Sequence, residues 1–153
     1  MTTKQLDSYA LEWIKLRSLA LAKSINKTTL EALRKELALG FEAGESIRQL
    51  TKRIEGYFDA NAKSRATLIS RTETVAASNA GAVDRYQKEG VEKKEWFAAM
   101  DERTRETHAA ANGQIVAVRD SFIVGADSMQ GPGQGSLPEE NINCRCTVLP
   151  VVE

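Results

Sequence analysis

The chain has 153 residues, 42% of them hydrophobic, which is enough apolar character for a single buried core. It holds no run of about 18 apolar residues and starts with a charged segment, so no spanning helix, signal peptide or membrane partner is indicated and we expect cytoplasmic synthesis. The net charge is zero, but residues 1–90 carry 15 basic and 11 acidic side chains, whereas residues 91–153 carry 6 and 10.

Residues 1–28 are interpreted as an N-terminal helical arm. Apolar residues recur at helical spacing and predict a helix over about residues 4–23. Its apolar stripe, which includes Trp13, must be covered. We therefore expect residues 4–23 to pack on the chain's own helices or on a second copy, which would make a homo-oligomer.

Residues 29–90 are predicted to be a helical hairpin followed by a long helix. Thr28 with Glu31 and Ser46 with Gln49 have the spacing of capping boxes, and Gly44 ends the first helix of the pair. A stripe of small apolar residues indicates a further helix from about residue 60 to residue 89, with Gly90 as its C-cap.

Residues 91–153 are predicted to be a small α+β domain, so the fold class is α+β: a helical N-terminal part, then short antiparallel strands and one short helix. Asp101 is a candidate cap for a short helix carrying Thr104 and His108, and Asn112-Gly113 indicates a tight turn. Two short strands, an exposed Gly- and Pro-rich loop (125–138) and a final strand carrying Cys144 and Cys146 follow.

Basic residues outnumber acidic ones between Arg48 and Arg71. This stretch predicts either weak, sequence-independent DNA binding or an ordinary solvated helical face, and the second is favoured. The basic side chains are Arg48, Lys52, Arg53, Lys63, Arg65 and Arg71, facing only Glu55 and Asp59.

His108 is the chain's only histidine, and Cys144 and Cys146 are its only cysteines. We expect these three side chains to lie close together on the buried side of the small domain, with Trp96 nearby. Reduced, packed thiols without metal or other cofactor are favoured, since C-x-C is not the usual spacing of zinc ligands. A zinc site at His108, Cys144 and Cys146, with Asp101 as a fourth ligand, is the alternative.

Arginines of the two C-terminal motifs are candidates for ion pairs. Arg145, between the cysteines, is predicted to point to the opposite face and to pair with Asp101, Glu106 or Glu140. Arg71, Glu73 and Arg103 form either a polar network that ties the long helix to the sheet or ordinary surface charge.

Several sequence features occur in a characteristic order: ISRTE (69–73) followed by Asn79 and Tyr86, then Trp96, DERTRETH (101–108), Asn112-Gly113 and the closing PEENINCRC (138–146), which contains NCRC. Over roughly residues 30–150 this order resembles the phage Mu F-like, or head morphogenesis, group of minor capsid proteins. The residues that match its motifs are Arg71, Glu73, Trp96, Asp101, Arg103, Thr104, His108, Gly113, Asn143, Cys144, Arg145 and Cys146.

The resemblance implies a structural protein of the virion, present in few copies inside the head or at the portal. Its partners would be portal, scaffold or capsid proteins, with a role in head morphogenesis and, in some systems, DNA packaging. No enzymatic activity is expected. The alternatives are a metal-dependent nuclease or toxin-like effector using Asp101, Glu102 and His108, and a helical interaction module that the small domain merely caps. An enzyme needs those side chains convergent and open to solvent.

Overall fold

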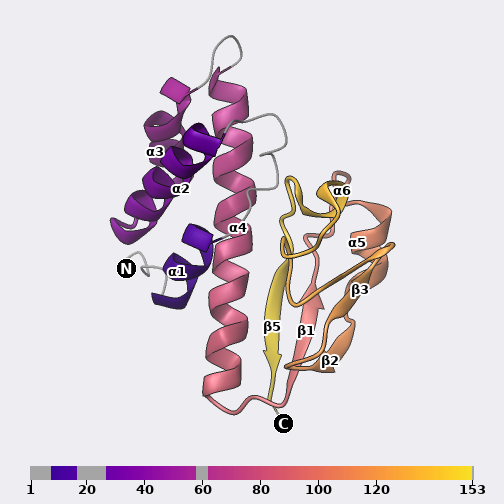
Figure 1. Cartoon of the computed structure of the whole chain (residues 1–153). Coiled ribbons are helices and arrows are strands. Elements are labelled where there is room, and N and C mark those ends of the chain that lie inside the picture. Colours follow the sequence, from indigo (N-terminus) through magenta and orange to yellow (C-terminus); the bar gives the residue numbers. More distant parts are fainter. Residues whose placement is uncertain (1–7, 17–26, 58–61, 153) are drawn as a thin grey trace.

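A computed structural model describes residues 8–16, 27–57 and 62–152. One long helix stands between a group of shorter helices and a small strand-rich unit (Figure 1). The helices of the first part are α1 (Ser8–Leu16), α2 (Lys27–Glu42), α3 (Ile47–Ile54) and α4 (Ala62–Lys88), with a 3₁₀ turn, η2 (Glu55–Tyr57), after α3. None of the described helices is both long and apolar enough to cross a membrane.

The strand-rich unit contains a three-stranded antiparallel sheet and a separate hairpin. The sheet has the order β2-β1-β5, and Trp96 of β1 lies opposite Val148 of β5. The elements are β1 (Lys93–Phe97), α5 (Glu106–Ala111), β2 (Ile115–Ala117), β3 (Phe122–Val124), β4 (Asp127–Met129), α6 (Pro138–Asn141) and β5 (Thr147–Val151). The predicted α+β fold is confirmed.

Local signals explain where several helices begin and end. The Ser46 hydroxyl accepts the Gln49 N–H while the Gln49 side chain accepts the Ser46 N–H, so the predicted capping box is present at α3. Gly90 has a φ of +75°, and the Val91 N–H donates to the Tyr86 carbonyl. The left-handed glycine and the hydrogen bond from Val91 back to Tyr86 form a Schellman motif, which ends α4 as predicted.

Helix α4 is shared by two hydrophobic cores. Ala66, Ile69 and Ala77 pack with the other helices, whereas Val83 packs with the strand-rich unit. The described part of the predicted arm, α1, buries Ala10 and Ile14 in the first core. The chain therefore covers this part of the stripe itself, while residues 4–7 and 17–23 of the predicted helix lie outside the described residues.

Three local expectations are corrected. Segment 125–138 is not simply an exposed loop, because it contains β4 and buries Gly131, Pro132 and Gly133. A Cβ on Gly133 would lie 2.9 Å from that of Ala76, so the absence of a side chain permits this close packing on α4. The N-cap of α5 is Arg105 and not the predicted Asp101, so Thr104 precedes this helix. Both cysteines precede β5, because β5 begins where its pairing with β1 begins.

Candidate functional site

Three segments of the small domain bring the candidate site together. His108 lies on α5, Glu140 on α6, and Cys144 and Cys146 on the extended segment that leads into β5. Asn143 turns the chain between α6 and the cysteines with a φ of +57°, and its N–H donates to the Thr72 hydroxyl on α4. Left-handed backbone of this kind is tolerated by asparagine better than by most residues.

The histidine and both sulfurs are in contact and buried. His108 Nδ1 lies 3.3 Å from Cys146 Sγ and 3.7 Å from Cys144 Sγ. Their exposed fractions are 2% for His108, 2% for Cys144 and 4% for Cys146. The predicted convergence of these residues is confirmed, although the sequence did not place Glu140 beside them.

The other ring nitrogen of His108 faces a carboxylate. Nε2 lies 3.0 Å from Glu140 Oε2, which also accepts the Thr107 hydroxyl at 2.9 Å. A carboxylate at Nε2 favours the tautomer with the proton on Nε2, which leaves the Nδ1 lone pair toward the sulfurs.

The two thiols perturb one another. The hydrogen bond from the Cys144 thiol, together with the contact with His108, lowers the pKa of Cys146 to about 5 against the opposing effect of burial. The same sulfur–sulfur contact, together with burial, raises the pKa of Cys144. Cys146 is therefore the more acidic thiol of the pair.

Aromatic side chains pack against the cluster of His108 and the two cysteines. The Trp96 ring meets His108 edge-on at a centroid distance of 5.6 Å and Phe122 at 5.4 Å. Trp96 is fully buried, as expected for the largest side chain at the centre of this core.

Arg145, between the cysteines, points outward as predicted and pairs with Asp101. Its guanidinium donates to both carboxylate oxygens at 2.5 and 2.6 Å. This contact, with a further hydrogen bond from the Arg103 N–H, holds the pKa of Asp101 well below its usual range. Asp101 and Arg145 are exposed, so the pair orients the loop after β1 rather than forming part of the buried cluster.

Arg105 makes a second contact between the two C-terminal motifs. Its guanidinium donates to the Ile142 carbonyl, just before the cysteines. Gly113, with a φ of +80°, makes the predicted turn, and its N–H donates to the Trp96 carbonyl at 2.8 Å. The side chain of Asn112 accepts the Ala98 N–H, so the Asn-Gly turn also fixes the end of β1.

Sequence comparison matches residues 31–149 to the family described as "Phage Mu protein F like protein". The chain belongs to this family. It is 31% identical to Minor head protein GP7 of Bacillus phage SPP1, over 76% of this chain and 39% of that protein. It is 30% identical to Uncharacterized protein YqbB of Bacillus subtilis, over 98% of this chain and 51% of that protein.

A further relative is NAD(+)--arginine ADP-ribosyltransferase EFV of Enterococcus faecalis, 31% identical over 74% of this chain but only 24% of that protein. The chain thus spans between about a quarter and a half of these three relatives. No solved structure matches it.

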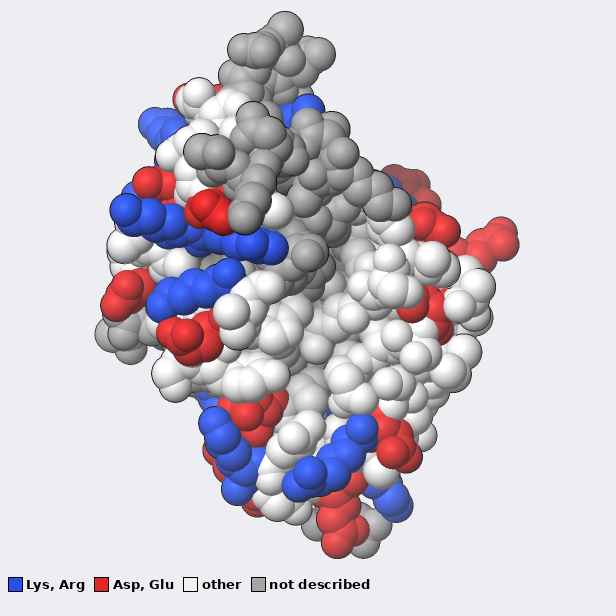
Figure 2. Space-filling model, viewed as in Figure 1, with Lys and Arg blue, Asp and Glu red and all other residues white. Residues whose placement is uncertain are grey.

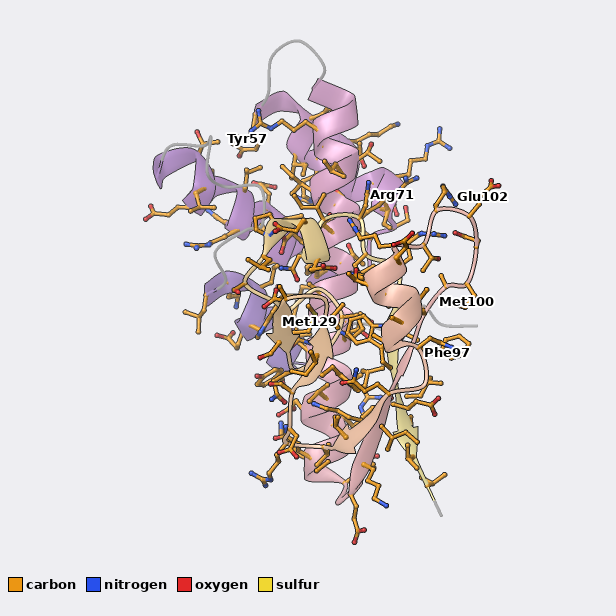
Figure 3. All side chains as sticks on the ribbon, turned by 90° about the vertical axis from the view of Figure 1, so that its right-hand side faces the viewer. Tyr57, Arg71, Phe97, Met100, Glu102 and Met129 are labelled. Atoms are coloured by element: carbon orange, nitrogen blue, oxygen red, sulfur yellow. The ribbon has the colours of Figure 1, made fainter. Side chains whose placement is uncertain are left out.

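Some predicted site residues of this Mu F-like chain do not converge. Arg71 and Arg103 are exposed while Glu73 is buried, and the polar network suggested for these three residues stays a prediction. Figure 3 shows Phe97, Met100 and Glu102 along one outer edge of the small domain. Asp101 and Glu102 are exposed there, whereas His108 is buried.

Asn79 of α4, which follows ISRTE in the motif order, links the helix to the sheet through hydrogen bonds that the sequence did not predict. Its Nδ2 donates to the carbonyls of Pro132 and Cys146, and its Oδ1 accepts the Val148 N–H at 3.1 Å. The side chain thereby satisfies backbone groups from two segments more than 50 residues away. Asn79 stood six residues after Glu73 in the motif helix, but nothing local indicated these partners.

Lys94 is a buried charged residue that the sequence analysis did not single out. Its side chain is fully buried, and Nζ donates to the Gln130 carbonyl at 2.7 Å and to the Gln130 side-chain oxygen at 3.0 Å. The ammonium lies 5.2 Å from the centroid of Phe122. Burial lowers the pKa of Lys94 to about 8, although Asp120 opposes the shift.

This buried lysine predicts a pH dependence of stability. Because the pKa in the folded state is below the ordinary 10.5, the unfolded chain holds the proton more tightly between about pH 8 and 10.5. The free energy of unfolding should therefore rise with pH across this window, by up to about 3 kcal/mol. The free energies of unfolding of the wild type and of Lys94→Met, measured with urea, should differ by an amount that changes with pH by about this much. Lys93→Met, at the exposed neighbouring position, should show no such pH-dependent difference. If the difference between the wild type and Lys94→Met did not change with pH, the lowered pKa of Lys94 would be contradicted.

Proposed function

We propose that the chain is a structural domain of a phage minor head protein, which acts in head morphogenesis through contacts with the portal, scaffold or capsid. The observation that carries this proposal is the family match over residues 31–149. The named minor head relative supports it, and localisation in the virion follows from it.

The closed arrangement of the site supports a structural role rather than catalysis. His108, Cys144 and Cys146 are buried, and among the described residues Asp101 is held by Arg145 instead of facing His108. A nuclease needs an open, convergent set of groups. The purified chain is therefore expected not to cleave DNA with Mg²⁺ or Mn²⁺.

Exposed apolar side chains on one face of the sheet, on which Glu95 also lies, support contact with a protein partner. Phe97, Ile115 and Leu149 project from neighbouring strands on the same side of the sheet, and they are 51%, 52% and 37% exposed. Apolar side chains grouped on a surface are typical of interaction sites.

Co-expression with the portal protein of the same phage tests the proposal. We expect the two proteins to co-elute in size-exclusion chromatography with light scattering, and Phe97→Ser to weaken the complex. Ile123→Ser is the matched control, because Ile123 is similarly exposed but belongs to the separate hairpin. Failure to co-elute with portal, scaffold and capsid proteins alike would count against the proposal.

DNA contact is a finer part of the proposal and rests on a groove between α3 and α4. Arg48, Lys52 and Arg71 line this open groove of about 630 Å³, together with the acidic Glu55. Arg53 is directed elsewhere, since its guanidinium pairs with Glu36 and Glu45, and the side chain of Lys63 lies outside the description. Arg65 is half-buried. On the face shown in Figure 2, basic and acidic side chains are interspersed, so any binding should be weak.

The salt dependence of DNA binding gives a quantitative prediction. If the three groove cations each contact one phosphate, the logarithm of the binding constant should fall with log salt with a slope of about −3. Fluorescence anisotropy with Arg48→Gln/Lys52→Gln should then give a slope of about −1. Lys35→Gln/Arg119→Gln removes two exposed charges outside the groove and should leave the slope unchanged. Equal slopes for both double variants would show that the groove does not bind DNA.

A further inference from the structure

The buried cluster has the donor set and spacing of a zinc site. His108 Nδ1, Cys144 Sγ and Cys146 Sγ all lie within 4.8 Å of one another. A tetrahedral zinc ion with Zn–S of about 2.3 Å and Zn–N of about 2.0–2.1 Å separates neighbouring ligand atoms by about 3.5–3.8 Å. The nitrogen–sulfur separations of 3.3 and 3.7 Å are close to that requirement.

Glu140 supplies a second and independent observation. Histidines that bind metals donate their other ring N–H to a carboxylate or carbonyl, which fixes the tautomer and aims the free nitrogen at the metal. Glu140 stands in that position, 3.0 Å from Nε2, and is itself buried. Nδ1, the nitrogen left free by this contact, is the one that faces both sulfurs.

We propose that His108, Cys144 and Cys146 bind one zinc ion, with Glu140 orienting His108. Thiolates and imidazole are the ligands that favour zinc over magnesium or calcium. Both sulfurs coordinate as thiolates, and a sulfur that still carries a proton releases it to solvent on binding. The fourth position of the tetrahedron takes a water molecule or another oxygen donor.

The ion would have a structural role. It would join α5 to the segment before β5, which lies 36 to 38 residues later, within a core already closed by Trp96. Metal binding of this kind contributes directly to folding free energy. The sequence alone favoured reduced thiols without metal, because C-x-C is an unusual spacing and nothing placed Glu140 at His108.

The test uses the 153-residue chain, purified without a histidine tag and under reducing conditions. We expect about one zinc per chain by inductively coupled plasma mass spectrometry. A chelator should lower the melting temperature, and added zinc should restore it. Cobalt added to the reduced apoprotein should give the visible bands of a tetrahedral site and a thiolate-to-cobalt band in the near ultraviolet, both lost on adding zinc.

Two neighbouring carboxylates provide the matched pair of variants. Glu140→Gln keeps all three ligands but weakens the carboxylate's hold on His108, so zinc affinity in a competition titration should fall by about 10–100-fold. Glu139→Gln, at the adjacent exposed position, should leave the affinity unchanged. This pair retains both cysteines and so remains informative if Cys144→Ser or Cys146→Ser fails to fold.

Three results would overturn the zinc site. The first is a zinc-free protein whose reduced form gives no cobalt spectrum. The second is a melting temperature that ignores the chelator in protein that contains zinc, which would place the ion elsewhere. The third is a Cys144–Cys146 disulfide in protein purified anaerobically, detected by mass spectrometry.

Discussion

Asn79→Asp is expected to destabilise the protein by about 3 kcal/mol or more at neutral pH, as measured by urea unfolding. The substitution preserves the size of the side chain but replaces the amide donor with a carboxylate oxygen. The carbonyls of Pro132 and Cys146 lose their hydrogen bonds from Nδ2, and a buried charge is placed beside them. Each buried polar group left without a partner costs about 1–3 kcal/mol, and a charge costs more.

The adjacent Ser78→Ala is the control for this variant. Ser78 lies next to Asn79 on α4 but is exposed, so its replacement should change stability by no more than about 0.5 kcal/mol. If Asn79→Asp were as stable as Ser78→Ala, the side chain of Asn79 would not be tying α4 to the segment around β5.

Trp96→Ala is expected to cost about 3–5 kcal/mol, because it removes the largest buried side chain of the second core and leaves a cavity. The cavity would open between His108 and Phe122, whose rings both pack edge-on against Trp96. Chemical unfolding monitored by circular dichroism measures the loss, which should be accompanied by increased reactivity of Cys144 and Cys146 toward a thiol reagent.

Phe97→Ala tests whether the cost arises from burial. Phe97 is the next residue of β1, but its side chain points to the opposite face and is 51% exposed. Its truncation should cost less than about 1 kcal/mol. Similar losses at positions 96 and 97 would contradict the inward orientation of Trp96.

The helices could be predicted from sequence because their signals are local. The Ser46–Gln49 capping box and Gly90 act within a few residues, and the first begins α3 while the second ends α4, as the sequence indicates. The approach of His108 to the cysteines was also predictable, since a small domain has only one buried side on which its apolar and thiol groups can gather.

The other contacts of the site could not be predicted, because they join residues that are far apart in the sequence. No local pattern relates Asn79 to Val148 or Glu140 to His108, although these contacts organise the site. The packing of segment 125–138 could not be predicted from the sequence for a similar reason. Glycine and proline indicate a turn, but whether Gly133 is exposed or packed against Ala76 depends on the position of α4.

The composition of purified phage particles tests the head-protein assignment most directly. Procapsids and mature heads would be isolated from cells in which the encoding phage is induced, and the protein quantified by mass spectrometry against the major capsid protein. The proposal predicts a few copies in each particle, lost from particles assembled without the portal. Absence from both kinds of particle, with all of the protein in the particle-free fraction of the lysate, would contradict it.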